Sequence, residues 1–283
     1  MVTRMRVRHL SRYLYDHPVS ASFNEARLTP LSTLWQHPLE TSVRVEEATW
    51  QHTYIDYWGT EVRAFEALRT HRELVVDSTS LVELDASLMP SPARDMSWVD
   101  IRGARVREAY GEYLAQTPKT APAAELARRA EQLAQGRTPH ETALALCALV
   151  HEQMTYLPGS TGVHTTGIEA WQARTGVCQD YAHLVVGALR AIGLPARYVS
   201  GYLHPDPSAP LGQAVTGESH AWVEWWLGEW SGHDPTNDAE VGEWHVLVGR
   251  GRDYSDVPPI KGLVAGSSGA SNLQVRVEVT RLS

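Results

Sequence analysis

The first 85 residues show the two-residue alternation of apolar and polar side chains that is typical of β-strands. Val43 and Val45 alternate with charged neighbours, and a second β-rich run centres on Leu74-Val-Val76. The segment Asp56-Tyr-Trp-Gly59 separates two such runs in the manner of a turn. Connections this short leave no room for crossover helices. We therefore predict an antiparallel, β-rich N-terminal domain over residues 1–85.

The patterning becomes helical after a proline-rich transition. Met89-Pro-Ser-Pro92 breaks regular structure, so residues 86–120 are interpreted as a linker with one helix from about Trp98 to Leu114. A second helix is expected to end near Gly136. Thr138-Pro-His-Glu141 is typical of a capping box with proline at the first helical position, so a third helix begins there.

A further helix is expected to begin at Cys178, because Gly193 and Pro195 mark its end and five apolar residues fall on one helical face (Leu184, Val185, Ala188, Leu189 and Ile192). The next segment, Ala196–Leu203, is typical of a strand. Residues 121–265 are therefore assigned to one α+β core.

Residues 266–283 are assigned to a C-terminal loop and strand. The run Gly262–Ser271 is rich in glycine and serine and is expected to be a mobile loop. Leu273–Thr280 alternates cleanly, and we expect this strand to pair with the N-terminal sheet rather than with the core sheet.

Composition narrows the classes of function. The 283 residues carry a net charge of −8 without a basic stripe, which argues against a nucleic-acid partner. No run approaches the length of apolar residues that a membrane span needs, and no signal peptide is visible. The chain has only two cysteines, so it lacks a disulfide framework. We expect a cytoplasmic protein with no membrane partner, and the oligomeric state stays open.

Three residues form a pattern that indicates thiol chemistry. Cys178 is expected at a helix N-terminus, where unpaired N–H groups and the helix dipole favour a thiolate. His220 and Asp234 follow in the order that a thiol acyl-transfer site uses. In these roles Cys178 attacks a carbonyl carbon, His220 transfers the proton, and Asp234 fixes the imidazole tautomer.

A hairpin can bring the histidine and the aspartate together. If Leu227-Gly-Glu229 is the loop, Trp226 lies opposite Trp230, and His220 and Asp234 share one face of the sheet at about 7–8 Å between backbones. A shift of one residue in register would put Asp234 on the other face, unless a bulge restored it.

The remaining site residues are weaker predictions. The N–H of Cys178 is one oxyanion donor, and Tyr156, Gln172 and Trp171 are candidates for the second, in that order. Trp222, Asp253 and Tyr254 are candidates for the wall of the cleft. Each residue has a simpler structural interpretation: a buried inert cysteine, a satisfied interior histidine, or a turn aspartate. That interpretation is preferred for Cys147.

The same segments resemble the transglutaminase-like superfamily. The resemblance rests on Gly176-Val-Cys-Gln-Asp-Tyr-Ala182, Ser219-His-Ala-Trp-Val-Glu224 and Asp234-Pro-Thr-Asn237, with a further bacterial signature in Gly251–Gly262 and in the N-terminal region. It implies a papain-like α+β core behind an N-terminal antiparallel β domain. It also implies a Cys-His-Asp triad at Cys178, His220 and Asp234. His233 departs from the apolar or aromatic residue expected before the aspartate.

Four functions are compatible with these observations. The preferred one is thiol-dependent hydrolysis of a peptide, isopeptide or other amide through an acyl-enzyme, with a peptide or protein amide as substrate and no cofactor. Transfer of the acyl group to an amine, as by a transglutaminase, uses the same triad. The third is a non-catalytic scaffold on the same fold. The fourth, a metal site of Cys178, His183 and His220, lacks the paired ligands of zinc sites, so no metal is expected.

Overall fold

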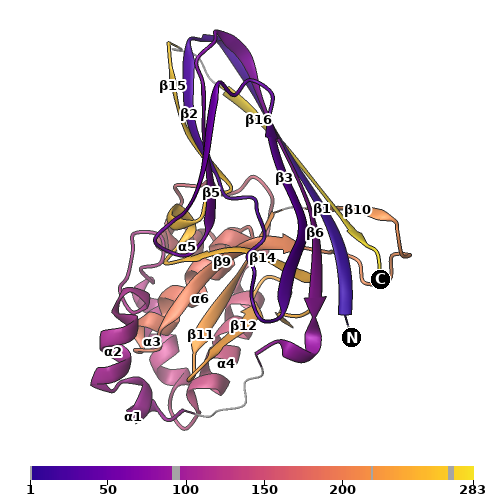
Figure 1. The fold of residues 1–283 in the computed structure, drawn as a ribbon. Coiled ribbons are helices and arrows are strands. Elements are labelled where there is room, and N and C mark those ends of the chain that lie inside the picture. Colours follow the sequence, from indigo (N-terminus) through magenta and orange to yellow (C-terminus); the bar gives the residue numbers. More distant parts are fainter. Residues whose placement is uncertain (1, 91–95, 218, 267–270) are drawn as a thin grey trace.

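The computed structural model describes residues 2–90, 96–217, 219–266 and 271–283. Figure 1 shows long strands rising from a more compact part that contains the helices, with the two chain ends close together. Two antiparallel sheets make up the N-terminal part, and a third, mixed with helices, forms the core. The predicted α+β fold class is confirmed.

The described strands form three sheets of four or five strands and one short parallel pair. The sheet orders are β10-β16-β1-β6-β3, β15-β2-β5-β4 and β13-β12-β11-β9-β14, with β7 beside β8. The strand bounds are β1 (Val2–Val19), β2 (Ala21–Ala26), β3 (Gln36–Val45), β4 (Trp50–Ile55), β5 (Glu61–Ala67), β6 (His71–Asp85), β7 (Thr155–Tyr156), β8 (Thr175–Gly176), β9 (Ala196–Leu203), β10 (Ala214–Gly217), β11 (Ser219–Trp226), β12 (Trp230–Asp234), β13 (Ala239–Glu240), β14 (His245–Gly251), β15 (Ile260–Ala265) and β16 (Ser271–Arg281).

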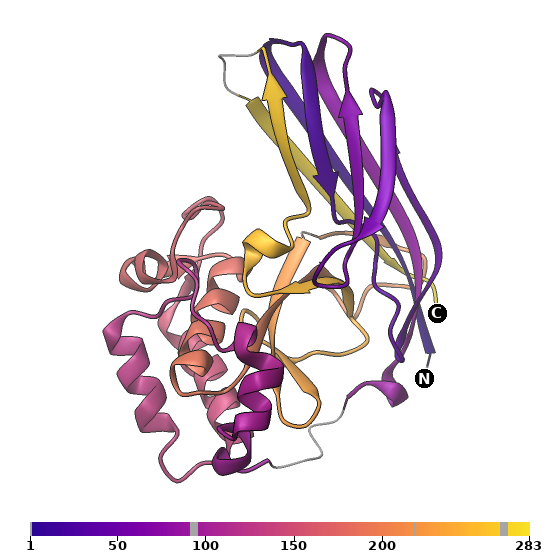
Figure 2. The ribbon, with the colours of Figure 1, turned by 60° about the vertical axis from the view of Figure 1, so that its left-hand side comes forward.

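Helices α4 and α6 pack on one side of the core sheet, and the N-terminal strands lie on the other (Figure 2). The bounds are α1 (Trp98–Ile101), α2 (Ala104–Tyr110), α3 (Ala124–Leu133), α4 (Pro139–Gln153), α5 (Gly167–Ala173) and α6 (Cys178–Ala191), with short 3-10 turns η1 (Ala86–Leu88), η2 (Gly111–Tyr113) and η3 (Tyr254–Asp256). The single helix predicted from Trp98 to Leu114 is wrong, because the chain leaves helical geometry at Arg102 and Gly103 and continues as α2 and η2.

The central helix α6 is buried along most of its length. Its side chains pack between α4 and the strand β11, in a core that contains Leu184, Val185 and Val223. The helix also passes close to the backbone at Thr120: a side chain at Gly187 would bring its Cβ within 1.7 Å of the Thr120 carbonyl oxygen. A residue without Cβ is therefore required there.

The predicted capping box of α4, between Thr138 and Glu141, is confirmed.

The C-terminal strands complete the N-terminal sheets. The prediction that the last strand returns to the N-terminal sheet is confirmed, since β16 pairs with β1. The prediction of a loop is wrong for residues 262–265, because they belong to β15, which pairs with β2. Most side chains of β15 are exposed, so the strand has no alternating pattern. Residues 267–270 of the predicted loop lie outside the described residues.

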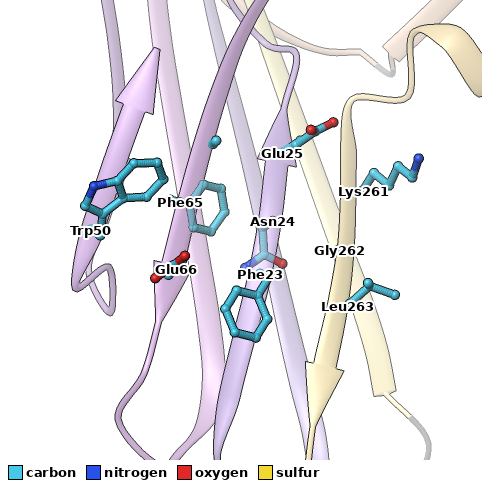
Figure 3. Close-up of a pocket in the computed structure, with 10 residues that line it drawn as sticks. Phe23, Asn24, Glu25, Trp50, Phe65, Glu66, Lys261, Gly262 and Leu263 are labelled. Carbon is cyan, nitrogen blue, oxygen red and sulfur yellow. The ribbon is translucent and has the colours of Figure 1, made fainter. Parts of the chain in front are cut away.

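The outer face of the second sheet carries exposed apolar side chains. Phe23, Trp50 and Leu263 lie around a shallow hollow of about 270 Å³ on strands β15, β2, β5 and β4 (Figure 3). A side chain at Gly262 would displace the Asn24 side chain, because a Cβ would lie 2.2 Å from the Asn24 amide oxygen. Neither Cys178 nor His220 lines this hollow.

A buried glutamine joins the N-terminal part to the core sheet. Gln36 is fully buried at the edge of β14. Its side-chain amide makes the two hydrogen bonds that a neighbouring strand would make: its Nε2 donates to the Leu247 carbonyl at 2.7 Å, and its Oε1 accepts from the Leu247 N–H at 2.8 Å. The Leu31 N–H donates to the same carbonyl at 3.0 Å. The edge of β14 is thereby closed by the side chain of the first residue of β3 and by a backbone group of the segment before it.

Replacing Gln36 with leucine is expected to lower the free energy of unfolding by about 2–4 kcal/mol, because it leaves the Leu247 N–H without an acceptor and removes a donor from the carbonyls of Leu31 and Leu247. Chemical denaturation of the two proteins measures the difference. Gln51→Leu is the matched control, since Gln51 is exposed on the edge strand β4 and should change stability little. Equal losses in the two variants would contradict the assigned role.

Candidate active site

Cys178 is the first residue of α6, as the sequence predicts. The turn before it is held by Asp180, whose Oδ2 accepts from the Val177 N–H at 2.9 Å and from the Thr161 hydroxyl at 2.5 Å. Gly176 packs directly on Asp180, where a Cβ would lie 2.8 Å from the Asp180 Cβ. Asp180 thus fixes the angle at which the chain enters the helix, and the thiol lies where backbone N–H groups are unpaired.

The thiol is half-buried beside the first residues of β11. Its Sγ lies 3.8 Å from the Ser219 carbonyl oxygen. The side chain packs against a small apolar cluster that includes Tyr198 and Ala221. Tyr254, predicted at the cleft wall, packs against the same cluster. Cys178 is therefore partly exposed, whereas Cys147 is fully buried. Burial raises the pKa of the Cys147 thiol well above that of a free thiol.

The hairpin of β11 and β12 has the predicted register. Trp226 lies opposite Trp230 and Val223 opposite His233, and Gly228 has a φ of +94° in the loop. The structure brings His220 and Asp234 together, with the histidine Nε2 2.7 Å from the Asp234 Oδ2. The remaining ring nitrogen of His220 is Nδ1, and Cys178 is near enough to the ring to raise its pKa. His233 lies on the opposite face of β12 and bonds to Asp238.

Asp234 is completely buried and accepts hydrogen bonds at both oxygens. Oδ1 accepts from the backbone N–H groups of Thr236 at 2.9 Å and Asn237 at 3.3 Å. Oδ2 accepts from the Asn237 side-chain amide at 2.7 Å as well as from His220. Burial alone would raise the pKa of Asp234, but the hydrogen bonds with His220 and its other donors outweigh burial and hold that pKa well below its usual range.

His220 is correspondingly stabilised as an imidazolium. Burial would lower its pKa, yet hydrogen bonds to Asp234 and Cys178 and the charges of both groups raise the pKa of His220 to about 10. A carboxylate on Nε2 keeps a proton there, so Nδ1 is the nitrogen that can exchange a proton with the thiol. The order carboxylate, imidazole, thiol is the arrangement of an activated cysteine.

The His220 ring is expected to titrate near pH 10 rather than near 6.5. Because its pKa is higher in the folded chain than in the unfolded chain, the protonated ring stabilises the fold fully below about pH 6.5, and this contribution is lost as the pH rises through about 10. NMR of the histidine ring protons measures the midpoint, and His220→Gln identifies the resonance. A midpoint near 6.5 would show that the ring has no stable anionic partner.

A fourth side chain, His245, joins this group, although nothing in its sequence context predicts this position. It is buried at the start of β14, and its Nε2 lies 3.5 Å from the Asp234 Oδ2. In the sequence it is one polar residue before an apolar run, with no motif around it. Only the order of strands in the sheet reveals its position.

An open cleft of about 540 Å³ lies beside His220 and Asn237. Tyr156, a predicted oxyanion donor, lines this cleft. The other lining residues are Leu203, Pro205, Thr216, Gly217 and Thr236. The substrate of a reaction at His220 would therefore approach between β7, the end of β9 and the loop after β12.

Several predicted site residues lie elsewhere. Trp171 is removed from the oxyanion candidates, because its ring is buried among the helices and its indole N–H donates to Glu125 at 3.1 Å. Gln172 is exposed on α5 and is not among the residues that line the cleft. Trp222 is only 1% exposed and packs behind His220, so it is not part of the cleft wall. Asp253 is buried and caps η3 through the Ser255 N–H.

The described residues do not bring Cys178, His183 and His220 together as a possible metal site. His183 is buried, its Nε2 accepts from the Tyr254 N–H at 3.1 Å, and burial lowers its pKa to about 3. Within the described part of the chain, the three possible ligands that lie within 4.8 Å of one another are His220, Asp234 and His245. Because their facing atoms form hydrogen bonds, we describe them as a hydrogen-bonded group.

Two family models match this chain. The transglutaminase-like superfamily matches residues 126–235, which contain Cys178, His220 and Asp234, and the bacterial transglutaminase-like N-terminal region matches residues 5–83. The chain belongs to the transglutaminase-like superfamily. Its membership agrees with the core, in which a helix that begins at a cysteine packs on an antiparallel sheet.

Relatives and solved structures extend this result. An uncharacterized protein of Mycobacterium leprae is 45% identical over 280 residues, which is 99% of each chain. A Pseudomonas aeruginosa protein-glutamine gamma-glutamyltransferase is 34% identical over 121 residues, 38% of this chain and 18% of that protein. A Cytophaga hutchinsonii structure, provisionally described as a cysteine protease, has a TM-score of 0.80 at 20% identity and covers 100% of this chain and 92% of its own. That likeness concerns the fold.

In the described part of the chain, we find no helix long and apolar enough to cross a membrane.

Proposed function

We propose that this protein is a thiol-dependent amide hydrolase that acts on a peptide or protein amide through an acyl-enzyme. The observation that supports this most strongly is the hydrogen bond between His220 and Asp234 beside an open cleft, with Cys178 near enough to raise the pKa of the His220 ring. A thiolate next to an imidazolium at a helix N-terminus is the reactive form of a catalytic cysteine. The proposal assigns catalysis to Cys178, His220 and Asp234.

The proposed reaction proceeds in two stages. The Cys178 sulfur attacks the amide carbon, and the carbonyl oxygen becomes an oxyanion that the Cys178 N–H stabilises. His220 gives its Nδ1 proton to the departing amine as the C–N bond breaks, which leaves a thioester. A water molecule then gives a proton to His220 and attacks the thioester carbon, and the thiolate leaves with the acid as product. Asp234 keeps its charge throughout and balances the imidazolium.

Tyr156 is the proposed second oxyanion donor. Its position on the cleft that His220 lines supports it over Gln172 and Trp171. We also retain the cytoplasm as the proposed location, on the argument from cysteine content given above. An amide on a peptide or protein is the proposed partner, and the reaction as written requires no cofactor.

The second candidate function is acyl transfer to an amine. It is supported by the similarity to the Pseudomonas aeruginosa protein-glutamine gamma-glutamyltransferase, which spans 121 residues. An amine would replace water in the second stage and produce a new amide. Thiol activation is common to the two reactions, so they differ in which nucleophile reaches the thioester.

A partition assay distinguishes hydrolysis from transfer. A glutamine-containing protein such as casein is incubated with the enzyme and a fluorescent primary amine, and released ammonia is compared with amine incorporated into protein. Hydrolysis predicts ammonia in large excess over incorporated label, and Cys178→Ala sets the background. Incorporation equal to ammonia release would establish the transferase instead. Absence of ammonia, label and peptide cleavage products would favour a non-catalytic scaffold.

A further inference from the structure

His245 takes no part in the proposed reaction, yet it also faces the Asp234 carboxylate. Its Nε2 lies 3.5 Å from the Oδ2 of Asp234, the same oxygen that accepts from His220 at 2.7 Å. The two imidazole rings are 6.3 Å apart between centroids. His245 is 4% exposed, so water contributes little to satisfying its ring.

The tautomer of His245 is set by the backbone. The Gly242 N–H donates to the Nδ1 of His245 at 3.2 Å, so Nδ1 is an acceptor and the ring proton is on Nε2. That proton points toward Asp234. Burial lowers the pKa of His245, and the attraction of Asp234 offsets this only in part, so the ring is neutral at pH 7. A neutral donor supports the carboxylate without adding a second cation beside His220.

The ring is also fixed in place by its surroundings. It meets the Trp222 ring edge-on, at 5.2 Å between centroids and an interplanar angle of 72°. The backbone of His245 pairs with Leu203 of β9, and two residues later the strand is held by Gln36 from the N-terminal part. The position of His245 is therefore determined by the core sheet on one side and by the N-terminal part on the other.

We propose that His245 is a positioning residue that holds the Oδ2 of Asp234 under the His220 ring. This inference rests on the proposed function, because it assigns the residue a part in activating Cys178. Asn237 and Thr236 bind Asp234 from its own loop, whereas His245 binds it from a separate strand. Only His245 among these three donors is fixed independently of the loop that carries Asp234.

Two substitutions of similar size separate positioning from packing. In His245→Gln the side-chain amide reaches about as far as Nε2 and can still donate to Asp234, but the acceptor for Gly242 is lost. In His245→Asn the amide reaches only about as far as Nδ1, so it can accept from Gly242 but cannot reach Asp234. The Asn variant is expected to lower kcat about tenfold with KM unchanged, and the Gln variant to stay within about threefold of the wild type.

The rate of Cys178 alkylation by iodoacetamide at pH 7 is measured in the same proteins and needs no substrate. We expect the same order, with the Asn variant slower than the Gln variant. This result would support the inference even if amide turnover failed to appear, so the two proposals can fail separately. In an Asp234→Asn background, the His245→Asn change should cause no further loss, because its target is gone. Equal losses in the two variants, a rise in KM alone, or additive losses in that background would overturn the inference.

Discussion

Replacing Cys178 with alanine is expected to lower the rate of amide cleavage by about 10⁴-fold or more, to the level of background. The sulfur is the only proposed nucleophile, and loss of the nucleophile removes the acyl-enzyme route completely. The fold should survive, because the side chain is partly exposed and packs only at the edge of a small apolar cluster. Activity is followed as ammonia or amine release, and thermal unfolding verifies the fold.

The second cysteine is the matched control for this prediction. Cys147 is fully buried in the core between the helices and should be dispensable for catalysis. Cys147→Ala removes only a small buried side chain, so we expect full activity in the folded protein and a modest loss of stability. Retention of activity in Cys178→Ala, or its loss in a well-folded Cys147→Ala, would assign the chemistry to another group.

Replacing Asp234 with asparagine is expected to lower kcat by about 10³- to 10⁴-fold while the fold is retained. The Thr236 N–H still needs an acceptor at Oδ1, so the new amide nitrogen takes the place of Oδ2. It then faces the Nε2 of His220 as a donor, which forces the ring proton onto Nδ1. A ring with its proton on Nδ1 cannot take the proton of the thiol.

Asp238→Asn is the control for the loss of one carboxylate. Asp238 is 42% exposed at its side chain and binds His233, on the far face of β12 from His220. We expect kcat within about threefold of the wild type, since the Asp238 carboxylate is partly exposed and its partner His233 faces away from His220. Equal loss of activity in Asp234→Asn and Asp238→Asn would show that Asp234 has no special role in catalysis.

The local features of this site could be predicted from the sequence because each depends on neighbouring residues. The capping box at Thr138, the start of a helix at Cys178 and the register of the hairpin follow from residue types within a few positions of one another. The period of two in a strand then determines that His220 and Asp234 share a face. These short-range rules were sufficient to bring two of the three proposed catalytic residues together.

The features that were missed depend on contacts between distant segments. Gln36 and Leu247 are 211 residues apart, and no local pattern indicates that a glutamine side chain closes a strand edge. His245 approaches Asp234 only because β9 lies between β11 and β14. Similarly, β15 lacks an alternating pattern because its side chains are mostly exposed, so its pairing with β2 could not be inferred.

Selective alkylation tests whether His220 activates the sulfur of Cys178. Wild-type protein and His220→Ala are treated briefly with limiting iodoacetamide at pH 7, and the label at each cysteine is quantified by peptide mass spectrometry. We predict fast labelling of Cys178 in the wild type, at least about tenfold slower labelling in His220→Ala, and protection of Cys147 in each protein. Equal labelling of Cys178 in the two folded proteins would show that His220 does not activate the sulfur.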